Sequence, residues 1–386
     1  MVACINFHHP KIPHISPMVF LRRFSTFRPL AAKFLARTTV SPGLNAQVLA
    51  PADLKPKSVV FLSTPQNIPT VIENAINFYQ IGNMQVLVAG VDSVVPNGNR
   101  NGISELWLDD YITFEDSVLL SAKDTVKPKQ SDGINVVGAK TNWKNVDAAL
   151  KLQLGSNCLE MSLANTIFST NQLATLFYFQ PPALQKQTGD PNMGEVLSNL
   201  TAILPPLEPS LETAVSSDRW TPLTEGEELV VTNCTGNLVR SINNGPAAKI
   251  LENNSKLMGI ASKETKVYVK VFRDNESKKY EVIAGGGGWG VKADLLAISP
   301  EAKMQVGDRL EFFMVTPEVR YADMSNTVVS NQFMFESLPE MSSYEMTLGS
   351  PQTIEHLFGC GSESGFVMDG VNHKSPGEVV RLAYQS

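Results

Sequence analysis

The sequence predicts an α+β fold in which two domains with mixed α/β-sheets follow a disordered N-terminal presequence. Three observations carry this prediction. No acidic residue precedes Asp53, a strand–helix–strand pattern covers residues 58–90, and short β-rich segments dominate the second half. Two domains are expected because a chain of 386 residues can bury more than one hydrophobic core.

The composition excludes several classes of protein. Formal net charge is -6, which disfavours a general nucleic-acid binder, because phosphate contacts need clustered Lys and Arg. No apolar run is long enough to cross a membrane as a helix, so no transmembrane segment is expected. The sequence has no CxxC pair, and only His356 and His373 lie outside the N-terminal region. We therefore expect neither a metal site nor a cofactor.

The N-terminal region has the composition of a targeting segment. Its charged residues are all basic and are interleaved with Phe and Leu: Lys11, Arg22, Arg23, Arg28, Lys33 and Arg37. An Arg-rich, acid-free segment that can form an amphipathic helix is typical of a mitochondrial transit peptide. We expect residues 1–45 to be presequence and spacer, recognised by the mitochondrial import machinery, with cleavage between Phe24 and Ser25. The protein would then reside in the mitochondrion, in the matrix; an ordered N-terminal helix is the alternative.

The first half alternates strand and helix signals. Ser58–Ser63 and Met84–Gly90 are apolar β-rich runs, and the segment between them has one apolar helix face (Ile72, Ala75, Ile76 and Tyr79). Further strands are predicted at Ile103–Phe114 and Ile134–Ala139. Helices are predicted from Trp143 to Leu154, before Gly155, and from Thr166 to Phe179. Prolines accumulate between Gln180 and Pro209, which predicts an irregular inter-domain region.

The second half has clearer β signals. Strands are predicted at Glu228–Thr232, Asn237–Ile242 and Arg309–Val315, and a hairpin pairs Val267–Phe272 with Tyr280–Ile283. Pro246 stands where a helix through Ala247, Ile250, Leu251 and Leu257 could begin.

One stretch of the second half resembles a known family. Residues 230–248 (VVTNCTGNLVRSINNGPAA) are similar to the junction of FIST domains, in which a strand, a Gly-Asn turn, a second strand and a Gly-Pro-Ala helix start recur. The resemblance implies a FIST N-like domain over 57–240 and a FIST C-like domain over 241–386, in a fungal-type mitochondrial member without an F-box. It implies sensing or binding of small ligands, and it fixes no ligand residue.

A glycine-rich segment is the most unusual local feature. Gly285, Gly287 and Gly290 satisfy GxGxxG, and Trp289 and Lys292 lie beside them. Backbone amides without side chains can surround an anion. However, Pro300 would end a following helix early, which disfavours a dinucleotide fold. We therefore expect these five residues to shape one wall of a ligand pocket.

The C-terminal run gathers Cys360, Glu363 and His373. These three residues are candidates for lining a pocket, and glycine-punctuated turns are the alternative interpretation. A Cys/His hydrolase would need a thiolate beside an imidazole. Acidic neighbours (Glu355, Glu363 and Asp369) would instead raise the pKa of the Cys360 thiol, so no catalytic residue is predicted.

The sequence thus predicts a FIST-like ligand-binding, sensory or interaction protein without catalytic activity. A small polar metabolite or a protein partner would bind in the cleft between the domains. The alternative is an enzyme that acts on a phosphorylated or nucleotide substrate through Gly285–Gly290. An organelle-specific assembly or RNA-associated factor is a third possibility, which the acidic charge disfavours.

Overall fold

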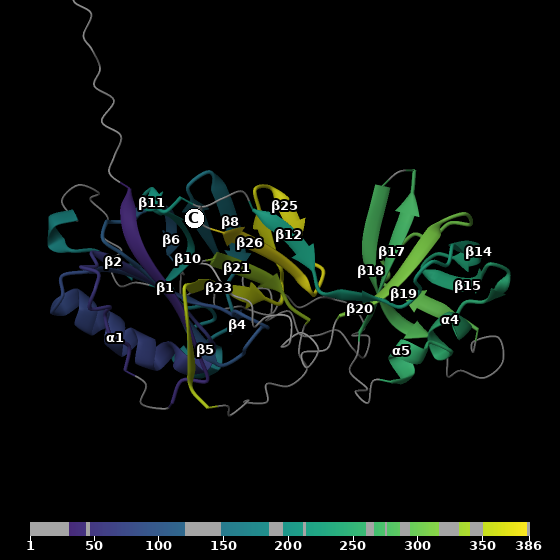
Figure 1. The fold of residues 1–386 in the computed structure, drawn as a ribbon, viewed down its shortest axis with the longest axis horizontal. Helices are drawn as coiled ribbons and strands as arrows, with labels where there is room; N and C mark the ends of the chain where they lie inside the picture. The colour runs from purple at the N-terminus through teal and green to yellow at the C-terminus, as the bar shows by residue number, and fades with distance from the viewer. Residues whose placement is uncertain are drawn as a thin grey trace, which may run out of the picture. The chain divides into compact units, whose positions relative to one another are not determined.

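The computed structural model describes residues 31–43, 47–119, 148–184, 196–210, 214–259, 266–274, 276–285, 294–315, 332–339 and 350–383. Mixed sheets and few helices make these residues an α+β fold, which confirms the predicted class (Figure 1). No helix within them combines the length and apolar character that crossing a membrane requires.

The N-terminal part of the fold is a mixed seven-stranded sheet in the order β11-β1-β5-β2-β3-β9, with β22 also paired to β1. The strands are β1 (Ala32–Val40), β2 (Ser58–Ser63), β3 (Gln85–Gly90), β5 (Gly102–Leu108), β9 (Leu176–Phe179), β11 (Leu207–Glu208) and β22 (Gln352–Glu355). Every residue of β2, β3 and β5 is buried, because both faces of this sheet are covered.

Helix α1 (Ile68–Gln80) covers one face of this sheet, as Figure 1 shows. The helix follows a 3-10 turn, η1 (Pro65–Asn67), and connects the parallel strands β2 and β3. Its apolar face packs on the sheet around Phe61 and Trp107. Phe78 of the helix stacks on Phe61, and the Trp107 ring contacts both of these rings edge to face. The strand–helix–strand unit predicted from residues 58–90 is therefore confirmed.

The opposite face shares one core with two further sheets. One is six-stranded and contains β6 (Thr113–Leu119), β7 (Ala149–Leu154), β8 (Asn157–Ser162), β10 (Leu197–Ile203), β24 (Phe366–Met368) and β25 (Val371–His373). The other is five-stranded and contains β4 (Ser93–Val94), β12 (Val215–Asp218), β21 (Gln332–Ser337), β23 (Leu357–Ser362) and β26 (Glu378–Ala383). A short helix, α2 (Ile167–Thr170), precedes β9.

Residues 220–315 form a separate eight-stranded sheet with its own core. Its strands are β13 (Trp220–Pro222), β14 (Leu229–Thr235), β15 (Leu238–Ile242), β16 (Gly245–Pro246), β17 (Val267–Arg273), β18 (Glu276–Gly285), β19 (Leu296–Ile298) and β20 (Arg309–Val315). Six of them close into a ring, because β20 pairs with both β17 and β14. We call this unit the ring sheet. The hairpin predicted for β17 and β18 and the strand predicted at β20 are confirmed.

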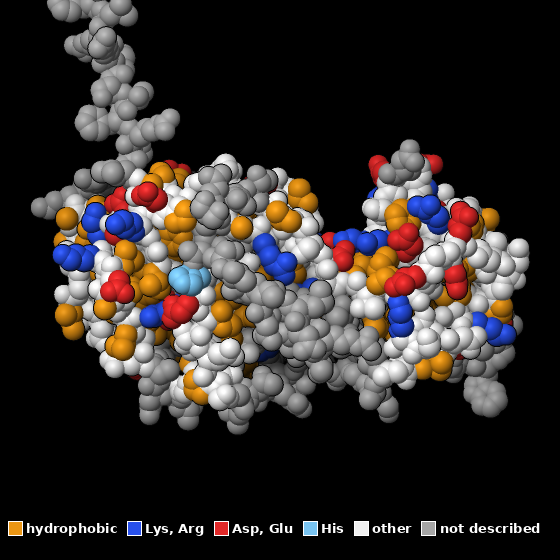
Figure 2. All heavy atoms as spheres, viewed as in Figure 1, with side chains coloured by type: hydrophobic (Ala, Val, Ile, Leu, Met, Phe, Trp, Pro, Cys, Tyr) orange, Lys and Arg blue, Asp and Glu red, His pale blue; other side chains and the backbone are white. Residues whose placement is uncertain are grey.

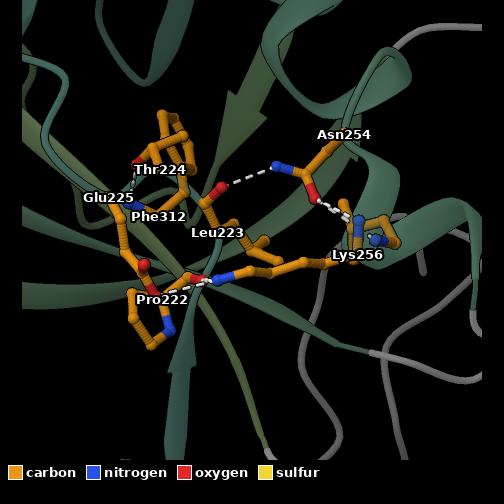
Figure 3. A network of polar contacts seen from close by, with 8 residues as sticks. Pro222, Leu223, Thr224, Glu225, Asn254, Lys256 and Phe312 are labelled. Atoms are coloured by element: carbon orange, nitrogen blue, oxygen red, sulfur yellow. Dashed lines mark hydrogen bonds and ion pairs between the residues drawn. The ribbon is translucent and has the colours of Figure 1, made fainter.

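Two short helices of the ring sheet, α4 (Lys249–Glu252) and α5 (Ser255–Met258), replace the single helix predicted after Pro246. Asn254 separates them, because its side-chain oxygen accepts hydrogen bonds from the backbone N–H groups of Lys256 and Leu257. Its amide donates to Leu223 O at 2.7 Å, and Lys256 Nζ donates to Pro222 O at 2.8 Å (Figure 3). This network attaches α5 to the chain that leaves β13.

Two predicted boundaries do not coincide with the limits of the structural elements. The predicted presequence and spacer over 1–45 includes β1, whose Ala36 is 1% exposed and which pairs along its length with β5. Phe34 and Leu35 of this segment belong to a sheet strand rather than to a free amphipathic helix. The predicted boundary between residues 240 and 241 falls inside β15, and Ala31–Ser386 is one compact unit by its contacts. In the sequence, the ring sheet lies between two groups of strands that together build the shared core.

Three element predictions are also wrong. Leu150, Leu152 and Leu154 alternate along β7 rather than marking a helix, because they face the shared core while β7 pairs with β8. The segment Thr166–Phe179 divides into α2 and β9 at Asn171, whose φ of 60° ends the helix. The proline-rich stretch contains β10, which pairs with β6 and β7. The strand predicted at Ile134–Ala139 lies outside the described residues.

Candidate functional site

Two pairs of parallel strands end at the same loop. The pairs are β2 with β3 and β21 with β23, and the loop is residues 91–101, which follow β3. Val91 N donates to Ser63 O at 2.9 Å, and β4 within the loop pairs with Cys360 and Gly361 of β23. Ligands of open α/β sheets commonly bind at the carboxyl ends of parallel strands. This loop is therefore the first place to look for a site.

Charged side chains gather at these strand ends. Arg100 Nη1 lies 2.8 Å from Glu363 Oε1, and each of the two side chains keeps 13% exposure. Arg100 also donates to Pro339 O at 3.1 Å. The backbone N–H of Glu363 donates to Asp92 Oδ2 at 2.8 Å. We name Asp92, Arg100, Glu336, Ser362 and Glu363 the carboxyl-end cluster.

Asp92 is the titratable centre of the carboxyl-end cluster. The pKa of its carboxyl is raised from 3.8 to about 6, chiefly by burial and to a smaller extent by the negative charge of Glu363. Hydrogen bonds from Glu363 N and the Ser362 side chain, together with the charge of Arg100, oppose this rise in pKa. Strongly shifted pKa values concentrate at functional sites, so Asp92 is a candidate functional residue whose pKa is shifted by burial.

Glu336 holds the loop in place from the opposite side. Its side chain is 1% exposed and accepts hydrogen bonds from Gly98 N at 2.8 Å and Asn97 N at 3.3 Å. The guanidinium of Arg219 pairs with the same carboxylate. A carboxylate buried this deeply needs such partners, because an unpaired buried charge costs several kcal/mol.

Some polar atoms around the carboxyl-end cluster lack a protein partner. Among the described residues, the buried atoms Ser93 Oγ, Asn97 Oδ1 and Ser337 Oγ make no hydrogen bond. Ser93 Oγ lies 2.4 Å from the position that a Cβ on Gly361 would occupy, so glycine leaves room for it. Buried polar groups in native proteins are rarely without partners. These three atoms therefore mark unsatisfied hydrogen-bonding capacity around the carboxyl-end cluster.

The structure separates the residues predicted from the C-terminal run. Glu363 belongs to the carboxyl-end cluster, and Cys360 lies beneath it in the shared core, with Sγ 3.2 Å from Met161 Sδ. Burial, followed by the charges of Asp92 and Glu336, raises the pKa of the Cys360 thiol well above its usual value. The pKa of the thiol is raised, as expected from the sequence. The carboxylates that raise it are Asp92 and Glu336 rather than the predicted Glu355, Glu363 and Asp369.

His373 is placed on β25, where its ring stacks on Phe366 with centroids 4.9 Å apart. Burial lowers the pKa of this imidazole, while Glu378 raises it and Lys279 lowers it. Within the described residues, no hydrogen bond or ring contact joins His373 to Cys360. The Cys/His arrangement that a hydrolase needs is therefore not formed by these two side chains.

The glycine-rich segment contributes one described residue. Gly285 ends β18 opposite Leu296 of β19, where a Cβ would lie 2.3 Å from Leu296 Cδ2. It serves close strand packing within the ring sheet, away from the carboxyl-end cluster, which other sheets carry. The other predicted residues of this segment, Gly287, Trp289, Gly290 and Lys292, lie outside the described residues, as do Phe24 and Ser25.

Sequence reasoning missed Asp92, Arg100 and Glu336. A signal was present for two of them, since Asp92 follows the apolar run of β3 and Glu336 ends the Phe-rich run of β21. Polar residues at the ends of buried parallel strands are typical of binding sites. No group of three or more His, Cys, Asp or Glu side chains in the described ranges is arranged to hold a metal ion.

Comparisons with known proteins return nothing that bears on this site. No family model, no curated protein and no solved structure matches the chain.

Proposed function

We propose that this protein is a FIST-like ligand-binding protein that binds a small polar ligand at the carboxyl-end cluster without transforming it. One observation carries the proposal: Asp92, with a pKa raised to about 6, lies among buried oxygen atoms that lack protein donors. A ligand with ammonium or hydroxyl groups would supply those donors. The raised pKa of the Cys360 thiol favours binding over nucleophilic catalysis.

Two features support the FIST resemblance. Residues 230–248 form β14, a turn at Gly236 and Asn237, β15, and then Gly245–Pro246 before α4. Gly236 has a φ of 62°, which suits glycine in a two-residue hairpin turn. In addition, both implied halves contribute to the carboxyl-end cluster, since Asp92 and Arg100 belong to 57–240 and Glu336 and Glu363 to 241–386. A ligand there would contact both.

The surface agrees with a small-molecule role better than with nucleic-acid binding. On the face drawn in Figure 2, acidic and basic side chains of the described residues are interspersed. Within the ring sheet Lys266 pairs with Glu281, and Lys279 of β18 pairs with Glu378 of β26 in the five-stranded sheet. Binding to phosphate backbones favours clustered cations instead.

The test is ligand-dependent thermal stabilisation of the full chain against a panel of small polar metabolites. A ligand bound only by the folded state raises stability by about 2.7 kcal/mol at a hundred times its Kd. Asp92→Asn should abolish the response, whereas Asp53→Asn, which changes an exposed carboxylate, should retain it. A response that survives Asp92→Asn would contradict the assignment of the site.

We further propose mitochondrial delivery by the N-terminal residues. Cleavage between Phe24 and Ser25 would leave β1 whole, because β1 begins at Ala32. Residues 1–30 fused to a fluorescent reporter should direct it to mitochondria, and replacing Arg22, Arg23 and Arg28 with Glu should stop this. Import that persists after charge reversal would contradict the proposal.

A further inference from the structure

A groove lies beside β1, a strand whose residues fall within the predicted presequence and spacer. Its volume is about 260 Å³, and its walls come from β1, β5, β22, Pro42 and residues 47–49. Its polar lining side chains are Arg37, Thr39, Gln47, Glu105 and Thr353, and its apolar ones include Val48 and Leu49. We call it the β1–β5 groove.

A buried ion pair forms one side of the β1–β5 groove. Arg37 and Glu105 are direct partners in the antiparallel pairing of β1 with β5. Arg37 Nε donates to Glu105 Oε2 at 2.8 Å, and Trp107 Nε1 donates to the same oxygen at 2.8 Å. The guanidinium also donates to Leu49 O and lies 5.7 Å from the centroid of the Trp107 ring.

The other carboxylate oxygen of Glu105 has no protein donor. All hydrogen bonds that Glu105 accepts from the described residues end on Oε2, which leaves Oε1 unpaired on a side chain that is only 4% exposed. This oxygen is not among the fully buried atoms without partners, so it keeps some contact with solvent, on a residue that lines the groove. A carboxylate can accept about four hydrogen bonds, and it favours charged donors.

The charges that line the β1–β5 groove or lie beside it on the same face sum to one negative charge. Glu355 of β22 is paired with Arg37 across the strands and therefore projects on the same side. Its charge also acts on Glu105. Two carboxylates thus oppose one guanidinium, and the hydroxyl groups of Thr39 and Thr353, 3.1 Å apart, add donors and acceptors at the rim.

We propose that the β1–β5 groove binds a small organic cation that carries N–H donors, of the alkylguanidinium or alkylammonium class. Its N–H groups would donate to Glu105 Oε1, and its alkyl part would contact Val48 and Leu49. This site is independent of the carboxyl-end cluster and adds to the proposed function.

The size and the chemistry of the groove favour this class over the alternatives. A volume near 260 Å³ is below the roughly 300–1,000 Å³ typical of drug-sized pockets, so the ligand is small. A hard metal cation would require several oxygen ligands, and the groove supplies one unpaired carboxylate oxygen. An anion would meet Glu105 and Glu355.

The experiment uses Trp107 as a reporter, because its indole N–H is bonded to the carboxylate that the cation would contact. The full chain is labelled with ¹⁵N, and the Trp107 indole signal is assigned through Trp107→Phe. Methylguanidinium chloride and butylammonium chloride are titrated. We expect a saturable shift of this signal, while potassium chloride and tetramethylammonium chloride, which have no N–H donors, produce no saturable shift.

Three variants make the result decisive. Glu105→Gln should weaken the affinity for methylguanidinium at least tenfold. Thr353→Phe, at an exposed position, should narrow the groove and weaken the affinity for methylguanidinium to a similar degree. This variant leaves the Arg37–Glu105 ion pair intact, so it still tests the proposal if Glu105→Gln fails to fold. Asp92→Asn should leave the titration unchanged.

An unmoved Trp107 signal, an equal shift with tetramethylammonium, or an undiminished response in Thr353→Phe would overturn the proposal. None of these outcomes affects the carboxyl-end cluster, whose own test depends on Asp92.

Discussion

The two sites are both built on an Arg–Glu pair, yet the pairs arise differently. Arg37 and Glu105 are neighbours in a strand register, so pairing β1 with β5 brings them together. Arg100 and Glu363 join a loop to the end of β23 across 263 residues of sequence. The first pair is a property of one sheet, whereas the second exists only when loop 91–101 and β23 meet.

The difference shows how one pair of strands can support two sites. Arg37 and Glu105 face the groove, and the adjacent residues Thr38 and Ser104 face the other way. Thr38 Oγ1 donates to Leu357 O at 2.9 Å, and Gly359 N donates to Ser104 Oγ at 3.0 Å. Alternation along β1 and β5 therefore gives one face to the β1–β5 groove and the other to β23, which carries the carboxyl-end cluster.

The largest effect is expected for Gly359→Ala, which should disrupt the strand pair that carries the carboxyl-end cluster. A Cβ at this position would lie 1.7 Å from Met334 O, with φ at 149°, so β21 and β23 could not keep their pairing. We expect a loss of more than about 4 kcal/mol in the free energy of unfolding, the range reached when buried backbone is displaced. Urea unfolding measures it.

Gly155→Ala is the matched control for Gly359→Ala. Gly155 also has a positive φ, 65°, but no atom lies within 4 Å of the position that a Cβ would occupy there. This variant should cost only about 1–2 kcal/mol, from the backbone conformation. Equal losses in the two variants would show that the close approach of β23 to β21 is unimportant.

The two ion pairs should differ in what they contribute to stability. Glu105 is 4% exposed and accepts hydrogen bonds from both Arg37 and Trp107, so Glu105→Gln should cost about 3 kcal/mol by removing a buried, paired charge. Glu363 is 13% exposed, and Glu363→Gln should cost about 1 kcal/mol, because water partly solvates the Glu363 carboxylate. Chemical denaturation of both variants checks this order. A larger loss in Glu363→Gln would reverse the comparison.

Asp92 should make stability depend on pH in a direction opposite to most carboxylates. Its pKa is about 6 in the folded chain and 3.8 in the unfolded chain, so the folded state binds the proton more tightly. This stabilisation is fully present below about pH 4 and is lost as the pH rises through 6. Relative to Asp92→Asn, wild type should therefore gain about 2–3 kcal/mol between pH 7 and pH 4.

Paired unfolding measurements across this pH range test the prediction, with Asp53→Asn as the control whose difference from wild type should not follow the same curve. The carboxyl ¹³C signal of Asp92 should titrate near pH 6. A midpoint close to the unfolded value of 3.8 would remove the basis for calling Asp92 the titratable centre.

The smallest effect concerns thiol labelling. Cys360 is 2% exposed and its thiol has a strongly raised pKa, whereas Cys158 and Cys234 are partly exposed. In a Cys4→Ser background, iodoacetamide near neutral pH should label Cys360 at least about tenfold more slowly than the other two, because the thiolate is the reactive species. Rapid labelling of Cys360 would indicate an accessible site beneath the carboxyl-end cluster.

Local patterns in the sequence determined several elements. The apolar runs of β2 and β3, the apolar face of α1 and the alternation of the β17–β18 hairpin each depend on spacing within one segment. The same reasoning failed for β7, where Leu150 and Leu154, four residues apart, were assigned to a helix. Short apolar runs fit both periods, and only pairing with β8 and β10 decides between them.

Tertiary structure alone decided the sites. Arg37 has the sequence context of a targeting segment, and its role follows from Glu105, which is 68 residues away. Asp92 and Glu363 are separated by 271 residues, and they meet because two parallel strand pairs end at one loop. Hydrophobic periodicity records which face of a segment is buried. It contains no information about which distant strand ends come together, because that depends on the order of strands in the sheets.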